Sequence, residues 1–299
     1  MLRPLHDVGE ELIEWASGDV RRVPTGFSLF DDRMSGGVAQ GEVMLFLART
    51  GVGKTWFALN VIDANPDTPA IFMSYEMHAR LLLQRLAAVH TGVRTSQIEE
   101  EIARDGYSPA LQKTIDAFPK LRFVDDATTG LGDLANMIDE YEAENGERPA
   151  FLAIDFLELI PSFGMTKTEG VWEISRAVKQ LARQSNIGIL LLHQVNRGEG
   201  RKQSKGGETI KNEGHRALSM TDASYGGEQL ADYIVGMYRP GLDPEMPEYE
   251  RKSRERDVRL QFLKTRTDGG IHPMGVQHDW DPRNGRIREI RFERRDPWA

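Results

Sequence analysis

The chain has 299 residues, with 38 Lys and Arg against 46 Asp and Glu, which gives a formal net charge of −8. Its hydrophobic fraction of 39% and charged fraction of 28% are typical of a globular protein. Because it has no cysteine, disulfides, thiolate nucleophiles and thiolate-bound metals are excluded, and a reducing cytoplasm is the expected compartment. The longest apolar runs, such as Ile187–Leu192, are far shorter than the ~20 residues of a membrane helix, and the acidic N-terminus is unlike a signal peptide. We therefore expect no membrane association.

The chain begins with a short amphipathic stretch, Leu5–Ala16, which predicts a helix too small to be a domain. We expect residues 1–21 to be an N-terminal helical extension and residues 22–299 to form one domain. Six apolar runs then predict the strands of that domain. They are Val43–Ala48, Ala70–Ser74, Leu121–Val124, Phe151–Asp155, Ile187–Leu192 and Tyr233–Tyr238. Most are continuously apolar, as expected of strands buried on both faces.

Amphipathic stretches between these runs predict crossover helices. They are Thr55–Ile62, His78–Thr91, Leu131–Asn145 and Val171–Ser185. The alternation indicates an α/β fold with a mostly parallel, twisted sheet flanked by helices. The segment Arg197–Tyr225 is long, polar and glycine-bearing, and such loops inside a compact domain are usually functional or disordered. After residue 257, short runs around a turn at Pro282–Gly285 predict an antiparallel C-terminal extension of the sheet.

The strongest motif begins at the end of the first predicted strand. It consists of Ala48, Arg49, Thr50, Gly51, Val52, Gly53, Lys54 and Thr55. This is the spacing of a phosphate-binding loop, with alanine in place of the first glycine. The glycines let backbone N–H groups point at phosphate oxygens, and the start of the next helix adds partial positive charge. We predict that Lys54 reaches the β- and γ-phosphates and that the Thr55 hydroxyl binds Mg²⁺. The alternative, an incidental glycine-rich turn, is disfavoured by the strand-loop-helix context.

Two carboxylates follow other predicted strands. Asp155 ends a buried strand, which predicts a second metal-facing oxygen beside the phosphates, although a plain strand-ending aspartate has the same pattern. Glu76 follows the strand Ala70–Ser74 and lies at the same edge of the sheet. A carboxylate there accepts a proton from an attacking water, or it merely complements a helix dipole.

Seven segments, taken in chain order, resemble the RecA-like ATPase core of the DnaB-type replicative helicases. They are Pro24–Asp31 with Ser35–Gly37 and Gln40–Glu42, Ala48–Asn60, Ser74–Met77, Ile154–Ile160, Leu191–Arg197, Glu228–Gly241 and Leu263–Gly270. The resemblance runs from about residue 22 to residue 293, and seven motifs in order are far more specific than any one. It implies a RecA-like P-loop ATPase with ATP and Mg²⁺ as cofactors, acting on single-stranded DNA in replication.

The resemblance also implies roles for single residues. Glu76 becomes the catalytic base and Gln194 the group that senses the γ-phosphate. Lys264 and Arg266 complete the site of an adjacent subunit, so the family implies a six-subunit ring. An arginine supplied in trans raises the rate ~10³–10⁵-fold in studied systems. His193 stands where the family usually has a small polar residue.

The segment Arg197–Arg216 is locally positive in an acidic chain. Its six basic residues, set against three glutamates, are Arg197, Arg201, Lys202, Lys205, Lys211 and Arg216. In the family the corresponding loop lines a channel and contacts the backbone of single-stranded DNA. Lys and Arg contacts to phosphates give sequence-independent binding, which suits a translocating motor. A solvated charged loop is the alternative.

Only about 22 residues precede the core, whereas DnaB-type helicases usually carry a separate N-terminal helical domain that docks primase. We therefore expect a minimal member of phage or mobile-element origin, for which a primase or loader interaction is doubtful. Three functions are weighed: a DnaB-type translocase or helicase, a RecA-like or RadA-like ATPase without processive unwinding, and an ATP-binding assembly switch. The full set of catalytic residues argues against the switch, and the first function is preferred.

Overall fold

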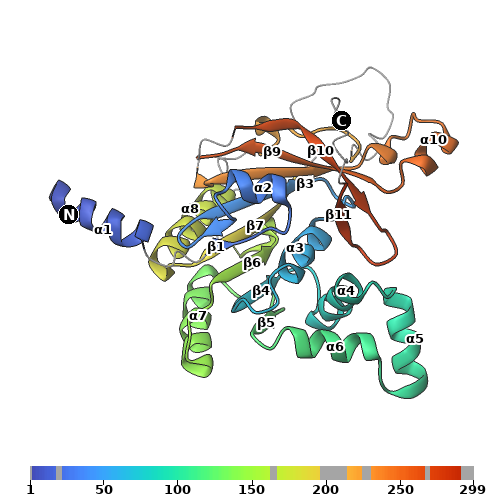
Figure 1. Cartoon of the computed structure of the whole chain (residues 1–299), viewed down its shortest axis with the longest axis horizontal. Coiled ribbons are helices and arrows are strands. Elements are labelled where there is room, and N and C mark those ends of the chain that lie inside the picture. The colour runs from blue at the N-terminus through green and yellow to red at the C-terminus, as the bar shows by residue number, and fades with distance from the viewer. Residues whose placement is uncertain are drawn as a thin grey trace, which may run out of the picture.

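A nine-stranded sheet forms the centre of the computed structural model, which describes residues 2–17, 22–161, 167–195, 214–223, 230–266 and 270–290 (Figure 1). The strand order is β11-β10-β9-β8-β3-β7-β6-β4-β5. The strands are β3 (Val43–Ala48), β4 (Ala70–Ser74), β5 (Leu121–Val124), β6 (Phe151–Asp155), β7 (Gly188–Gln194), β8 (Tyr233–Tyr238), β9 (Asp257–Lys264), β10 (His272–Trp280) and β11 (Ile287–Glu289). Two short strands, β1 (Arg22–Val23) and β2 (Val38–Ala39), pair separately.

The strands from β8 to β5 in this order are all parallel, whereas β9, β10 and β11 are antiparallel to their neighbours. Because the parallel strands run the same way, their carboxyl ends share one edge of the sheet. The register pairs Ala48 at the end of β3 with Gln194 at the end of β7. The predicted α/β fold with an antiparallel C-terminal extension is therefore confirmed.

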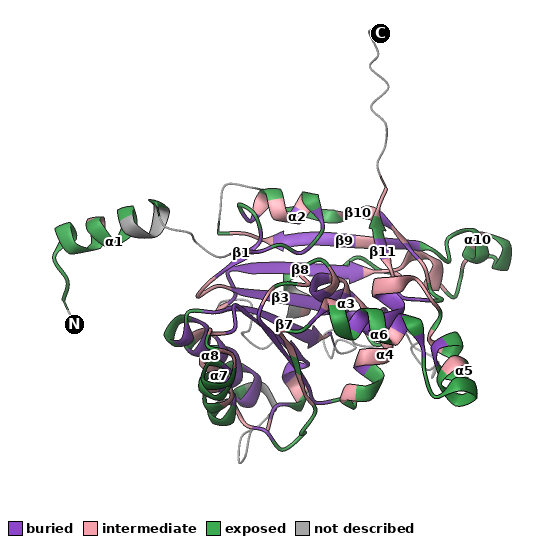
Figure 2. Cartoon of the chain, turned by 60° about the horizontal axis from the view of Figure 1, so that its bottom comes forward, coloured by how far each residue is buried: buried purple, intermediate pink, exposed green. Residues whose placement is uncertain are grey.

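Helices cover both faces of the sheet. The described helices are α1 (Leu5–Ser17), α2 (Ser28–Arg33), α3 (Lys54–Asp63), α4 (Ala79–Thr91), α5 (Thr95–Asp105), α6 (Pro109–Ala117), α7 (Leu131–Asn145), α8 (Lys167–Ser185) and α10 (Glu248–Ser253), with the 3₁₀ turns η1 (Leu157–Leu159), η2 (Met220–Ala223) and η3 (Pro240–Leu242). Figure 2 shows α7 and α8 together on one side of the buried strands, and α3, α4 and α6 on the other.

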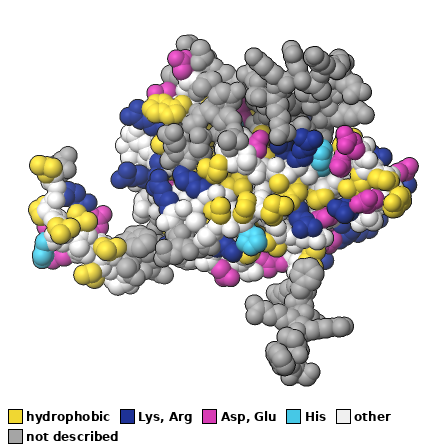
Figure 3. Space-filling model, turned by 90° about the horizontal axis from the view of Figure 1, so that it is seen from above, with side chains coloured by type: hydrophobic (Ala, Val, Ile, Leu, Met, Phe, Trp, Pro, Cys, Tyr) yellow, Lys and Arg dark blue, Asp and Glu magenta, His cyan; other side chains and the backbone are white. Residues whose placement is uncertain are grey.

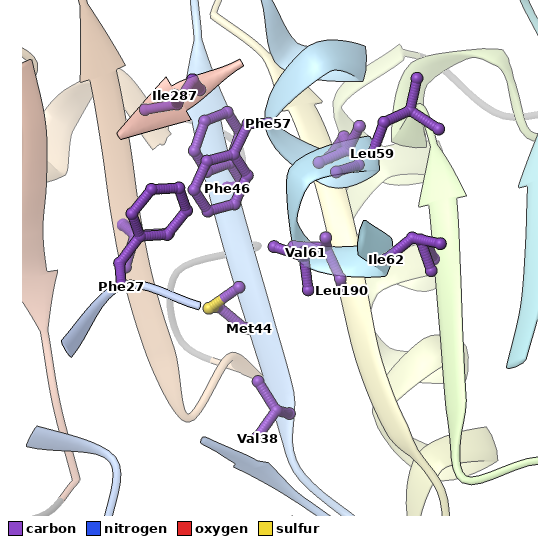
Figure 4. Packing of buried hydrophobic residues seen from close by; sticks show 14 of the residues in the cluster. Phe27, Val38, Met44, Phe46, Phe57, Leu59, Val61, Ile62, Leu190 and Ile287 are labelled. Atoms are coloured by element: carbon purple, nitrogen blue, oxygen red, sulfur yellow. The ribbon is translucent and has the colours of Figure 1, made fainter. Parts of the chain in front are cut away.

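The core has two halves because successive residues of a strand face opposite sides of the sheet. On β3, Met44 and Phe46 pack with α3 and α4, whereas Leu45 and Leu47 pack with α7 and α8. The rings of Phe46 and Phe57 stack with their centroids 3.9 Å apart, which fixes α3 over β3 (Figure 4). This stacking fixes the start of α3 relative to the end of β3. The predicted phosphate loop, residues 48–55, lies between these two points.

Most predicted strands have the bounds that the apolar runs gave, but some elements differ. Strand β7 runs on to Gln194 because its polar last residues still pair with β3. Helix α8 begins at Lys167, four residues earlier than predicted. Helices α5 and α6 were not predicted, because their apolar residues pack mainly on α4 instead of on the sheet.

Helix α1 lies away from the sheet in Figure 1, and its apolar residues Leu5, Leu12 and Ile13 are exposed. The division into an extension of residues 1–21 and a domain of residues 22–299 stays a prediction. None of the helices in the described ranges is long and apolar enough to cross a membrane. Figure 3 shows a group of Lys and Arg side chains on the half of one face nearer to α1, and further Lys and Arg side chains among acidic ones on the other half.

Candidate active site

The phosphate loop joins β3 to α3 at the carboxyl edge of the sheet. Gly53, the residue before α3, has a backbone φ of 121°, a conformation that residues with a Cβ rarely adopt. A Cβ at Gly53 would lie 2.2 Å from Cη2 of Trp280, whose ring packs against the loop. Trp280 was not predicted as part of the site, because it arrives from β10, far away in the sequence. The guanidinium of Arg239 lies 4.8 Å from the centroid of this ring.

Thr55 and Asp155 meet below the loop. The Thr55 hydroxyl donates a hydrogen bond of 2.6 Å to Oδ2 of Asp155, at the end of β6. Burial raises the pKa of Asp155 to about 6, while Thr55 and Lys54 oppose this shift. Its other oxygen, Oδ1, is buried and has no hydrogen-bond partner among the residues that the structure describes. A hydroxyl and a carboxylate with a free buried oxygen are hard oxygen ligands of the kind that Mg²⁺ prefers, so these residues fit the predicted metal.

Lys54 lies among acidic groups at the first turn of α3. Its Nζ donates to Oε1 of Gln194 at 3.4 Å and lies 5.0 Å from the ring centroid of Phe156. Burial lowers the pKa of Lys54, and attraction to Asp155, Glu76 and Glu158 opposes the change. The ammonium group is therefore poorly hydrated, so an anionic ligand such as a polyphosphate displaces little water when it binds there.

Glu76 is exposed two residues beyond the end of β4. It interacts electrostatically with Lys54 and with Arg85 of α4. Burial lowers the pKa of Arg85, and Asp155 and Glu76 counteract this effect. The guanidinium of Arg85 lies 5.1 Å from the ring centroid of Trp56. Arg85 was not predicted as part of the site, because it lies inside a helix and belongs to none of the motifs.

Two further ionisable residues lie behind the site. Nδ1 of His193 is 2.7 Å from Oε1 of Glu158, and both side chains are buried. The second oxygen of Glu158 accepts the N–H of Gln194 at 3.3 Å. His193, the unusual residue before the predicted γ-phosphate sensor, thus has a specific neighbour. In the sequence, Glu158 interrupts an apolar run and His193 follows another, which does not reveal that the two side chains lie together.

Lys264 and Arg266 lie at the opposite edge of the sheet. Strand β9 is antiparallel to β8, and Lys264 pairs with Ile234 near the start of β8. Nζ of Lys264 donates to the carbonyl oxygen of Ala231, and NH1 of Arg266 donates to Asp232 at 2.7 Å. The six residues of β3, roughly 20 Å at 3.3 Å per residue, separate this edge from the phosphate loop. Arg266 and Lys54 of one chain are therefore not brought together.

The phosphate loop also touches both ends of the predicted DNA-binding loop. The N–H of Val195 donates to the carbonyl oxygen of Ala48 at 3.0 Å. NH1 of Arg49 donates to the carbonyl oxygen of Arg216 at 2.8 Å, and its NH2 lies 3.6 Å from Asp222. The other basic residues predicted to bind DNA lie outside the described residues. They are Arg197, Arg201, Lys202, Lys205 and Lys211.

Comparison with known proteins relates this architecture to a family of helicases. The replicative DNA helicase DnaC of Bacillus subtilis is 28% identical over 264 residues, which cover 85% of this chain and 54% of that protein. The replicative DNA helicase DnaB of Geobacillus stearothermophilus is 29% identical over 249 residues, which cover 77% of this chain and 50% of that protein. The chain thus spans about half the length of these relatives.

Solved structures share the fold. One of them, described as an ATPase domain, superposes with a TM-score of 0.75 at 22% identity, over 96% of this chain and 97% of that one. A DnaB-like replicative helicase, solved in a study of its interactions with primase, gives a TM-score of 0.74 at 22% identity, over 96% of this chain and 66% of that one. The model of the DnaB-like helicase C-terminal domain matches residues 22–278, so the chain belongs to this family.

Proposed function

We propose that the chain is an ATP-driven translocase and helicase of the DnaB type, which acts on single-stranded DNA in replication and hydrolyses ATP between the subunits of a ring. The observation that carries this proposal is the division of the ATPase residues between two edges of one sheet. Lys54, Thr55, Asp155 and Gln194 lie at the carboxyl edge, and Arg266 lies at the other. Neighbouring subunits arranged head to tail complete each site.

In hydrolysis the residues at the carboxyl edge have separate tasks. Lys54 neutralises charge on the β- and γ-phosphates, and the amide of Gln194 contacts the γ-phosphate. Glu76 accepts a proton from the attacking water, and its exposed position leaves it accessible to that water. Thr55 and the free oxygen of Asp155 would hold Mg²⁺, which supplies charge neutralisation between the phosphates when bound.

The arginine at the other edge supports a cyclic assembly. Arg266 and the phosphate loop are too far apart to serve one nucleotide within a chain. A contact between two different faces, repeated by rotation, closes into a ring when the rotation fits, and a hexamer is our expectation. Arg266 then stabilises charge on the phosphoryl group bound by its neighbour.

The contacts of the phosphate loop support a link between nucleotide and DNA. Ala48 and Arg49, the first two residues of that loop, bind the chain at Val195, just before the basic segment, and at Arg216, its last residue. A shift of the loop on ATP binding is therefore transmitted to both ends of the segment that we propose to contact DNA phosphates. Such contacts are independent of sequence and sensitive to salt.

The experiment that tests this function follows ATP hydrolysis and the unwinding of a forked duplex in one reaction, with wild type and Lys54→Ala. Wild type should hydrolyse ATP faster with single-stranded DNA present and should separate the strands. Lys54→Ala should do neither. Stimulated hydrolysis without strand separation, at concentrations where rings are seen by electron microscopy, would instead identify a RecA-like or RadA-like ATPase.

Mixed oligomers test the shared site. Arg266→Ala should bind ATP but lose hydrolysis, by about 10³-fold or more, because it deprives the neighbouring site of its arginine. Glu76→Gln should lose hydrolysis in its own site, but its Arg266 should still complete the site of the neighbouring subunit. Mixing the two variants should restore part of the activity, because some interfaces then contain both groups. No recovery under conditions where labelled subunits exchange would refute the shared site.

A further inference from the structure

Arg266 is held by a buried acid, Asp232, to which the segment Glu228–Gly241 assigned no role of its own. Asp232 lies immediately before β8 and is only 4% exposed. Its Oδ1 accepts from NH1 of Arg266 at 2.7 Å. Its Oδ2 accepts the N–H of Val43 at 2.8 Å and the ammonium group of Lys179 at 2.5 Å. Lys179 also donates to the carbonyl oxygen of Gly41 at 2.8 Å.

The carboxylate of Asp232 is held in place by groups other than Arg266. Val43 holds Asp232 at the start of β3, and the N–H of Asp232 donates to the carbonyl oxygen of Val43 at 2.9 Å. Lys179, from α8, already compensates the buried negative charge. The contact with Arg266 uses the other oxygen and is not needed to neutralise the acid. Asp232 is thus a rigid acceptor with one oxygen directed to Arg266.

Within the described residues, the side chain of Arg266 is bound to the protein through one nitrogen, NH1. Its side chain is 53% exposed, although NH1 is bound to Asp232. A guanidinium is planar and has five N–H donors, so an acceptor on one nitrogen leaves the others for phosphate oxygens. An exposed arginine without such an acceptor samples many rotamers, and ordering it at the moment of reaction slows the reaction.

We propose that Asp232, fixed by Lys179 and Val43, is the positioning residue that aims Arg266 at the nucleotide of the neighbouring subunit. This inference rests on the proposed function, because it requires Arg266 to act in trans. The opposite possibility is that Asp232 restrains Arg266 and must release it. The two possibilities predict opposite changes in turnover when Asp232 is substituted. Loss of a positioning residue lowers the turnover, whereas loss of a restraint raises it.

The first test is the steady-state hydrolysis of ATP by Asp232→Asn, which keeps the size of the side chain and removes its charge. We expect kcat to fall about 10- to 100-fold, as for a misplaced catalytic group. KM for ATP should change less than about twofold, because the subunit's own phosphate loop lies at the other edge. An unchanged or increased kcat would overturn the proposal.

The second test separates positioning from a structural role. A subunit with Asp232→Asn keeps its own Glu76 and phosphate loop, so mixing it with Glu76→Gln should restore activity as fully as mixing Arg266→Ala does. If Arg266→Ala is rescued and Asp232→Asn is not, the defect acts within its own subunit and the proposal is wrong. If neither is rescued, the shared site itself fails, and this inference fails with it.

Two variants guard against misfolding and against a general effect of losing an acid. Asp232→Glu keeps the charge for Lys179 but displaces the acceptor by one methylene, so it should fold normally and lose about 10-fold in kcat. Asp257→Asn is the matched control, because Asp257 is also buried and contacts an arginine, Arg259, at 3.1 Å on β9. Its kcat should equal that of wild type, and an equal loss in both Asp→Asn variants would overturn the assignment.

Discussion

Glu158 and His193 are ionisable side chains buried next to each other behind the nucleotide site. Removing one partner of a buried polar pair leaves the other without compensation, so Glu158→Ala should lower the free energy of unfolding by about 2 kcal/mol. The variant should also bind ATP less tightly, because the backbone N–H of Gln194 loses its acceptor and the side chain of Gln194 is then held less firmly at the proposed nucleotide site. Denaturant unfolding and ATP titration measure both effects. The control is Glu173→Ala, on the exposed face of α8, and equal stability of the two variants would contradict the prediction.

Single residues at strand ends could be predicted to lie together, whereas pairs between distant elements could not. Lys54, Asp155 and Gln194 follow from a motif or from the rule that parallel strands end at one edge. Asp232 and Arg266 are 34 residues apart, and their contact depends on the register of β9 on β8. That register is set by packing of both strands in the core, about which a single sequence gives no direct information.

The strand β10 carries a histidine that makes stability depend on pH. His278 is buried against Phe27, and Nδ1 lies 2.9 Å from the carbonyl oxygen of Val276. Burial lowers the pKa of His278 below its usual 6.5, although Val276 and Glu289 favour the charged form and Arg259 disfavours it. The unfolded chain therefore binds a proton at a higher pH than the folded one does.

The sign follows from this difference. The contribution of His278 to stability is complete above its unfolded pKa near 6.5 and is lost as the pH falls through the folded value. The wild type should therefore lose more of its free energy of unfolding than His278→Leu does between about pH 7.5 and about pH 5. Denaturant unfolding at several pH values measures the difference, and parallel curves would show that His278 does not contribute.

The segment from Gly214 to Ala223 links the phosphate loop to the antiparallel strands. Gln261 of β9 holds Leu218 by two hydrogen bonds, of 2.9 and 3.0 Å, and Arg49 pairs with Asp222. Asp222→Asn should weaken this link while the catalytic residues stay in place. Hydrolysis without DNA should be unchanged, and its stimulation by oligo(dT) should fall several-fold. The same substitution at the exposed Asp105 is the control, and equal stimulation of both variants would refute the coupling.

The elements of the sheet were predictable because their apolar runs are long and bounded by polar residues. The helices α5 and α6 were not, since Ile98 and Ala110 pack on residues of α4 such as Ala87 and do not show a broad apolar stripe. Strands β1 and β2 have two residues each, too few for any periodicity. A local pattern therefore predicts elements that cover the sheet better than elements that cover another helix.

On the scale of the molecule, catalysis by a shared site should depend on protein concentration. In the proposed assembly, a subunit alone has the phosphate loop but lacks the arginine that completes it, so hydrolysis per subunit should fall on dilution below the dissociation constant of the assembly. ATPase assays over a dilution series, with mass photometry of the same samples, test this expectation. Constant activity per subunit across the transition to monomers would exclude a shared site.

In the proposed assembly, the placement of Asp232 and Arg266 at the edge opposite the phosphate loop also limits how many nucleotides are hydrolysed. In an open chain of subunits, one end presents a phosphate loop without an arginine and the other end an arginine without a phosphate loop. The number of complete sites is then one fewer than the number of subunits, and only closure makes the two equal. Opening a ring at one interface therefore silences a single site and leaves the others active. In the proposed ring, such a break would admit a DNA strand while the remaining interfaces stay competent.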